Sequence, residues 1–321
     1  MNRRMPVILA AALWVALGAG SALAARSCHA VDEDARAAQA ASDLDALKGF
    51  YTEAHDPAVG CDPLFLADFG RDVALAHIDR FFALYDQDKD AAAHRRVLEE
   101  ARNYGEPWQL LVTLGGVEAD LGNHDLAASF YQQAVRELET ASRSVDSGAA
   151  AAANLLTADE FEELYAKMAE SALLAQTFSP PAAARGETVS GLFADAYRGY
   201  VVKSVPVPVQ FQFDSTRFTG KGEQVAAYLL DYLQSEKLPR IELIGHTDPK
   251  GSDAYNLDLS VRRAEAVKQY LQAGGYAGQI DVDGRGESEP FQPVDPERFA
   301  DDVDAKHQLD RRVELVRNPD H

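Results

Sequence analysis

Two oppositely charged side chains, Asp248 and Arg263, stand out in the C-terminal third of the 321-residue sequence. Asp248 follows an apolar run that is typical of a strand, in a turn that leads into a helix. On that helix Arg263 shares a stripe with Asn256, Ser260 and Val267, because these positions recur at helical spacing. We therefore expect Asp248 and Arg263 to lie near one cleft. Their opposite charges suit a zwitterionic amino-acid end, with one ammonium and one carboxylate.

The elements that must position these side chains begin near Val205, where apolar residues change to an alternation of period two. The patterns predict strands over 205–213, 240–245, 280–286 and 311–317, and helices over 219–235 and 256–272. A polar loop with three prolines precedes the last strand. This order, β-α-β-α-β-β, implies an α+β fold with a small sheet that helices cover on one face.

Five short motifs occur in order along this segment. They are Phe211-Gln212-Phe213-Asp214-Ser215, Gly245-His246-Thr247-Asp248 with Gly251, Asn256 with Leu259-Ser260 and Arg263-Ala264, Gly284-Arg285-Gly286-Glu287 with Pro290, and Arg311-Arg312-Val313-Glu314. With these motifs, the region 205–317 resembles the OmpA-like peptidoglycan-binding domain. Five agreeing motifs are far more specific than one short pattern.

The resemblance implies a ligand, the diaminopimelate residue of the peptidoglycan stem peptide. In the family, the aspartate matching Asp248 holds the diaminopimelate amine. The arginine matching Arg263 holds its carboxylate through a two-pronged contact. Thr247, Asn256 and Arg311 match supporting positions. Lysine-type peptidoglycan lacks the extra carboxylate, so Arg263 is expected to discriminate against it.

Two alternatives remain open at these positions. Asp248 and Arg263 taken alone could simply pair with each other and brace the helix, as surface ion pairs commonly do. Asp310 stands where the family usually has asparagine. That change would either weaken ligand binding or give Asp310 an ion pair with Arg311 or Arg312.

The first residues predict a secretory signal peptide over 1–24. Arg3 and Arg4 supply a positive start, an apolar run follows, and 22–24 read A-L-A, a cleavage motif. The alternative is an uncleaved membrane anchor, because the apolar stretch 7–24 is almost long enough to span a bilayer. Cleavage would place the protein in the periplasm, with possible association with the outer membrane.

The sequence has only two cysteines, Cys28 and Cys61. In an oxidising compartment such a pair commonly forms a disulfide, which is our prediction. The alternative is zinc bound by both cysteines with His29 and His55, but their spacing matches no established zinc pattern. We therefore predict no metal site.

The region 25–178 is expected to form an all-helical domain, because alanine is abundant and apolar residues recur every three or four positions. Within it, 107–138 resembles one tetratricopeptide repeat, with Gly122 at the turn. An ordinary helical hairpin is the alternative. A linker rich in proline and alanine follows over 179–204, with a short helical piece near 189–201.

The overall charge excludes one class of function. Lys and Arg total 31 against 51 Asp and Glu, a net charge of −20, so binding to nucleic acid phosphates is not expected. We find no Ser-His-Asp ordering, no H-E-x-x-H and no context for a catalytic cysteine, so we predict no enzyme and no cofactor.

Together these features predict a non-covalent link between diaminopimelate-type peptidoglycan and a periplasmic helical scaffold. The helical half would recruit a protein partner that the sequence does not identify. The alternative is a protein-protein scaffold of an envelope complex, in which the OmpA-like domain is degenerate.

Overall fold

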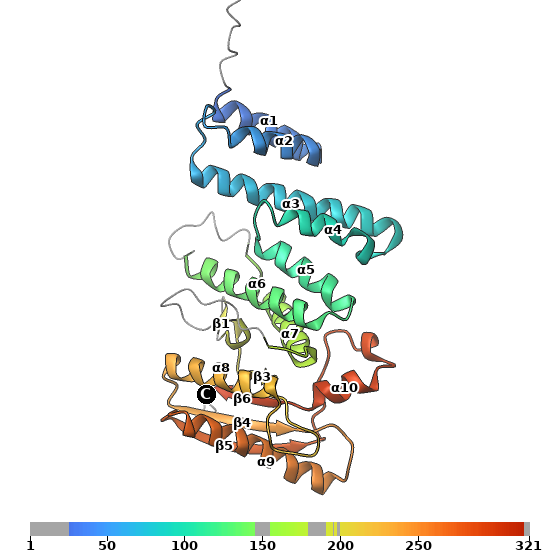
Figure 1. Ribbon diagram of the computed structural model, residues 1–321, viewed down its shortest axis with the longest axis vertical. Coiled ribbons are helices and arrows are strands. Elements are labelled where there is room, and N and C mark those ends of the chain that lie inside the picture. The colour runs from blue at the N-terminus through green and yellow to red at the C-terminus, as the bar shows by residue number, and fades with distance from the viewer. Residues whose placement is uncertain (1–25, 145–154, 179–190, 195, 198–199, 318–321) are drawn as a thin grey trace, which may run out of the picture. The chain divides into compact units, whose positions relative to one another are not determined.

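The computed structural model describes residues 26–144, 155–178, 191–194, 196–197 and 200–317 (Figure 1). The expected signal peptide lies outside the described residues, as does most of the expected linker. Among the described residues, no helix is both long and apolar enough to cross a membrane.

The described elements begin with a run of helices, α1 to α7, and continue with strands separated by further helices. The helices are α1 (Cys28–Ala40), α2 (Leu44–Ala54), α3 (Pro63–Asp88), α4 (Ala91–Ala101), α5 (Trp108–Asp120), α6 (His124–Ser144), α7 (Ala158–Leu174), α8 (Gly220–Glu236), α9 (Asp253–Ala273) and α10 (Val303–Asp310), with 3₁₀ turns η3 (Gly191–Phe193) and η4 (Glu297–Phe299). The strands are β1 (Ala196–Tyr197), β2 (Tyr200–Val201), β3 (Ser204–Val207), β4 (Arg240–His246), β5 (Gln279–Gly286) and β6 (Val313–Arg317). The chain divides into two compact units. The first ends at Leu66, and the second begins at Ala67.

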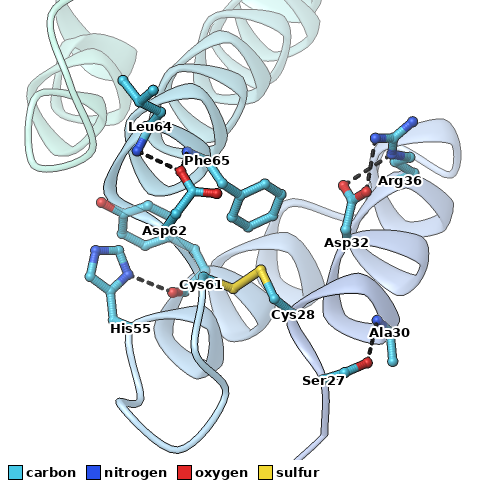
Figure 2. The surroundings of a disulfide bond; sticks show 11 residues. Ser27, Cys28, Ala30, Asp32, Arg36, His55, Cys61, Asp62, Leu64 and Phe65 are labelled. Atoms are coloured by element: carbon cyan, nitrogen blue, oxygen red, sulfur yellow. Dashed lines mark hydrogen bonds and ion pairs between the residues drawn. A yellow bond between two sulfur atoms is a disulfide. The ribbon is translucent and has the colours of Figure 1, made fainter.

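The first unit is a helical pair, α1 and α2, closed by a disulfide between Cys28 and Cys61 (Figure 2). Cys28 is the first residue of α1 and Cys61 lies just before α3, with their Cα atoms 5.1 Å apart. Val31 and Leu47 pack in the interior of this unit. Both sulfurs are taken up by the bond, so neither is the thiolate that a zinc site would need.

Removing this disulfide is expected to destabilise the first unit by about 3–4 kcal/mol. The bond closes a loop with a sequence separation of 33, and the loss of chain entropy in the unfolded state grows with the logarithm of that length. Thermal unfolding of the oxidised protein, the reduced protein and a Cys28→Ser, Cys61→Ser variant would measure the effect. Equal melting temperatures in all three would show that the bond contributes nothing to stability.

The second unit begins with helices, and α5 and α6 form the hairpin expected over 107–138. Gly122 turns the chain with a φ of +75°, and Gly115 lies so close to Tyr131 that a Cβ there would be 2.7 Å from its ring. Glu118 is fully buried and forms an ion pair with Arg95 of α4 at 2.6 Å. A helical hairpin is thus present, whereas its assignment as a tetratricopeptide repeat stays a prediction.

A four-stranded sheet in the order β3-β6-β4-β5 follows in the same unit. β4 and β5 pair in parallel, while β3, β6 and β4 pair antiparallel. Along β4 buried and half-buried residues alternate, and α9 packs on β4 and β5. The expected α+β fold is therefore confirmed, although the domain boundaries remain predictions.

The first expected strand is shorter than its apolar alternation indicated. β3 ends at Val207 instead of continuing to Phe213, whose side chain is 96% exposed. Pro208 has no N–H to donate to a neighbouring strand, and the N–H of Val209 donates to the carbonyl of Val207 at 2.8 Å. The backbone therefore turns away from the sheet, and Phe211 forms only an isolated bridge with Phe218.

Two other expectations need correction. The described part of the helical piece near 189–201 consists of the 3₁₀ turn η3 and the antiparallel strands β1 and β2, in which tyrosine and valine suit strands. The loop before the last strand contains the additional helix α10. Its N-cap is Asp302, whose side chain accepts the N–H of Ala305. This cap is a local helix signal, but the prolines upstream led us to expect an irregular loop.

Candidate ligand-binding site

Close packing of α9 against the sheet positions Arg263. The hydroxyl of Ser260 accepts the N–H of Gly286 at 3.0 Å and donates to the carbonyl of Leu257 at 2.7 Å. At Gly245 of β4, a Cβ would meet the carbonyl oxygen of Ser260 at 2.1 Å. Glycine thus lets the helix backbone touch the strand, and this contact fixes the next turn of α9, which carries Arg263.

Arg263 is a buried cation with few protein partners. Its side chain is 6% exposed, its Nε donates to the carbonyl of Ser215 at 3.3 Å, and its guanidinium lies 5.2 Å from the centre of the Phe211 ring. Burial and then the positive charge of Arg311 lower the pKa of Arg263 to about 10. The group is still protonated at neutral pH, in a place where its charge is poorly solvated.

Asp248 forms an ion pair with Arg311, and not with Arg263 as the bracing alternative supposed. Its Oδ2 lies 2.6 Å from Nη1 of Arg311, and its Oδ1 accepts the N–H of Lys250 at 2.9 Å. Burial alone would raise the pKa of Asp248, but the hydrogen bonds from Arg311 and Lys250 and the charge of Arg311 lower it overall. Asp248 is therefore a carboxylate at neutral pH.

The two supporting residues next to Asp248 are both buried. Asn256 donates from Nδ2 to the backbone carbonyl of Asp248 at 3.3 Å and to the carboxylate of Glu287. The N–H of Thr247 donates to the carbonyl of Gly286 at 2.9 Å. Within the described residues the hydroxyl of Thr247 has no hydrogen-bond partner. Asn256 therefore holds the turn in place, while the Thr247 hydroxyl keeps its hydrogen-bonding capacity.

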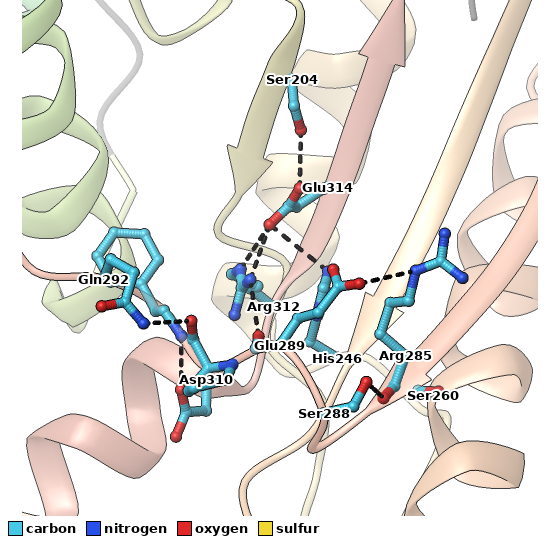
Figure 3. Close-up of polar contacts among 12 residues, drawn as sticks. Ser204, His246, Ser260, Arg285, Ser288, Glu289, Gln292, Asp310, Arg312 and Glu314 are labelled. Carbon is cyan, nitrogen blue, oxygen red and sulfur yellow. Dashed lines mark hydrogen bonds and ion pairs between the residues drawn. The ribbon is translucent and has the colours of Figure 1, made fainter.

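Asp310 and Arg312 both bond to neighbouring parts of the chain (Figure 3). The carboxylate of Asp310 accepts the N–H of Phe291 at 2.9 Å, so it fixes the loop after β5. Arg312 donates from Nε to Glu314 at 2.8 Å and from Nη2 to the carbonyl of Glu289 at 3.2 Å. The aspartate that replaces the usual asparagine at position 310 therefore anchors this loop.

His246 lies beside the ion pair of Arg312 and Glu314 and stays neutral. It is 1% exposed, and its Nε2 is 3.5 Å from Oε1 of Glu314. Burial and the charge of Arg312 lower the pKa of His246 to about 4, although Glu314 opposes the shift. His246 is the last residue of β4 and directly precedes Thr247.

The buried neutral state of His246 predicts that stability falls in mild acid. Between about pH 6.5 and pH 4 an unfolded histidine binds a proton that folded His246 does not, so the free energy of unfolding decreases as the pH falls, by on the order of 2–3 kcal/mol. Urea unfolding at pH 7.5 and pH 4.5 would measure it, with His246→Asn as the comparison. An identical pH dependence in both proteins would show that His246 is not the titrating group.

A pocket of about 230 Å³ opens at this place. Arg263 and Arg311 both line it, together with Phe211 and the glutamines Gln176, Gln210 and Gln308. Asp248 adjoins the pocket through its ion pair with Arg311. Arg263 and Arg311 were expected from the sequence, and Phe211 belonged to a recognised motif. The three glutamines carried no sequence signal, because neutral side chains outside a motif are indistinguishable from ordinary surface residues.

Several known proteins resemble part of this chain. The model of the OmpA family matches residues 210–299. Outer membrane porin F of Pseudomonas fluorescens is 36% identical over 115 residues, which cover 35% of this chain and 33% of the porin. The peptidoglycan-associated lipoprotein of Haemophilus influenzae is 34% identical over 101 residues, covering 30% of this chain and 66% of the lipoprotein. The chain therefore spans less than two thirds of the length of either relative.

A similar crystal structure is that of the peptidoglycan-associated lipoprotein from Burkholderia pseudomallei. It is 28% identical, covers 36% of this chain and 89% of the lipoprotein chain, and has a TM-score of 0.29.

Proposed function

Because the C-terminal part of this chain is an OmpA-like domain, we propose that it binds peptidoglycan non-covalently, with Arg263 on the diaminopimelate carboxylate and Asp248 on its amine. The observation that carries this proposal is the state of Arg263. A buried guanidinium is costly unless an anion compensates its charge. Among the described residues, Arg263 makes one hydrogen bond, from Nε to Ser215, so both Nη groups remain for a ligand carboxylate.

The other charges fit the other end of a zwitterion. Asp248 is ionised and 13% exposed, and it uses one oxygen on Arg311 and one on the N–H of Lys250. Each carboxylate oxygen accepts more than one hydrogen bond, so a ligand ammonium joins these partners without displacing them. Charge-assisted hydrogen bonds contribute roughly 1.5–3 kcal/mol each, enough for a weak grip at one site. Many sites on one mesh would add avidity.

The helical half of the chain is the part that this binding would link to the wall. We propose that the helical half is a periplasmic scaffold, that the sheet domain links it reversibly to the wall, and that the protein is not an enzyme. Two relatives, a peptidoglycan-associated lipoprotein and an outer membrane porin, support a place in the cell envelope. The net charge of −20 argues against a nucleic acid partner.

The second candidate is a protein-protein scaffold in which wall binding is lost. The helical part of the second unit carries a groove of about 780 Å³, lined by Arg71 of α3, Trp108 of α5 and Arg136 of α6. The lining also includes the acidic residues Asp72, Glu106 and Glu137, and tryptophan and arginine are enriched at protein-binding surfaces.

Co-sedimentation with purified sacculi separates the two candidates. The mature protein is mixed with sacculi of the diaminopimelate type or of the lysine type, and the pellets are compared. We expect the protein to pellet with the first and to remain largely in solution with the second, since lysine lacks the carboxylate that Arg263 holds. Protein that stays in solution with both would refute wall binding and favour the scaffold.

A further inference from the structure

The C-terminal end of α7, in the helical half, is completed by side chains of the sheet domain. Lys221 donates from Nζ to the carbonyls of Ala172 and Ala175 at 2.8 and 2.6 Å. Gln308 donates from Nε2 to the carbonyls of Leu173 and Leu174 at 2.9 and 3.0 Å. Four consecutive carbonyls therefore take their partners from α8 and α10.

This arrangement fixes the end of α7 against the sheet domain. The last carbonyls of a helix have no partner within the helix, and they carry the negative end of its dipole. A lysine ammonium suits that end, and Lys221 is 6% exposed, so water does not compete for it. Asp125 of α6 continues the anchoring, because its carboxylate accepts the N–H groups of Gln176 and Thr177. The backbone after α7 is thus held from both sides.

The anchored segment forms one side of the ligand pocket. Leu173 and Gln176 line the same 230 Å³ pocket as Arg263 and Arg311. The amide of Gln308 is used on α7, whereas Gln176 is exposed and uses one amide hydrogen, on the carbonyl of Leu174 at 3.3 Å. Its second amide hydrogen and its oxygen remain for a ligand.

We propose that the helical half takes part in wall binding, with Gln176 as a specificity-determining contact that hydrogen-bonds the stem peptide bound at Arg263. The inference rests on the proposed function, since it names a further contact of the same site. A neutral amide suits this place. It donates to a ligand carboxylate or peptide carbonyl without pairing with Arg263, so the Nη groups of Arg263 stay available. A glutamate at the same position would bring a negative charge into the pocket and compete with the ligand carboxylate.

The test is isothermal titration of the full mature chain with a purified stem tetrapeptide that contains meso-diaminopimelate. We expect Gln176→Ala to weaken binding about 3- to 10-fold, the effect of one lost hydrogen bond. We expect Gln176→Glu to weaken it more than about 10-fold, because the new carboxylate occupies the guanidiniums. Gln87→Glu is the matched control, since Gln87 is exposed on α3, does not line the pocket, and gives the same change in net charge.

The outcomes separate this inference from the proposed function. If Arg263→Ala loses the tetrapeptide while both Gln176 variants bind like wild type, the proposed function stands and the role of Gln176 is refuted. If the wild-type chain itself binds neither the tetrapeptide nor sacculi, both are refuted. If Gln87→Glu weakens binding as much as Gln176→Glu, net charge explains the effect and the specific contact is refuted. Unchanged melting temperatures of the variants would exclude misfolding as the cause.

Discussion

Replacing Arg263 with methionine should weaken binding to diaminopimelate-type sacculi about 100-fold, while the protein remains as stable as wild type. Binding falls because the ligand carboxylate loses a charge-assisted, two-pronged partner in a buried place. Stability does not fall, because methionine keeps the apolar contact with the Phe211 ring and removes a charge that is only 6% exposed. Sedimentation with sacculi measures the first effect and urea unfolding the second.

Arg262 offers a matched control for this experiment. It is the neighbouring residue on α9, it is half exposed, and it pairs with Asp258 at 2.8 Å. Arg262→Met removes the same charge from the same helix and should leave binding within about two-fold, since exposed pairs contribute little. Equal losses in the two variants would mean that the wall recognises general positive charge rather than the pocket. Arg263→Lys should bind weakly, because an ammonium cannot make the two-pronged contact.

Replacing Gly245 with alanine should destabilise the sheet domain by about 3 kcal/mol and weaken wall binding with it. A Cβ at this position would lie 2.1 Å from the carbonyl oxygen and 2.8 Å from the carbonyl carbon of Ser260, which are backbone atoms of α9. The helix has to move away from β4, because no rotamer change relieves a clash with backbone. Arg263, one turn further along α9, moves with it. Urea unfolding followed by circular dichroism measures the loss.

A second glycine of the same domain provides the control for this loss. Gly220 opens α8, and a Cβ there would have no heavy atom within 4 Å. Gly220→Ala should therefore change the free energy of unfolding by less than about 1 kcal/mol, in either direction. A Gly245→Ala protein that unfolds at the same urea concentration as Gly220→Ala would show that α9 adapts, and that its close contact with β4 is not what positions Arg263.

The fold of the C-terminal region was largely predictable because its signals are local and redundant. Strand and helix patterns occur in a regular order, and the turn at Gly245-His246-Thr247-Asp248 is recognisable by its residues alone. The errors had different causes. The alternation up to Phe213 indicated a strand. The strand ends at Val207 because Pro208 has no N–H to donate to a neighbouring strand. Prolines suggested an irregular loop where the Asp302 cap starts α10.

The candidate site was predictable only as far as its charges. The stripe on α9 placed Arg263 beside the sheet, and the turn placed Asp248 near it. The partner of Asp248 proved to be Arg311, because the chain returns through α10 before the last strand, a path that no sequence pattern indicated. Gln176 could not have been found, since it is separated from Arg263 by 87 positions along the chain and only the docking of α7 brings the two to one pocket.

The hydrogen bonds of Lys221 and Gln308 to the end of α7 also matter when the protein is pulled. If the chain is the wall link proposed above, load applied at Arg263 and at the helical half acts on this junction. Lys221 and Gln308 each hold two of the four carbonyls, so the junction opens only when each side chain gives up two hydrogen bonds. The two halves would therefore separate only at high load, and tension applied at the wall would be transmitted to the helices.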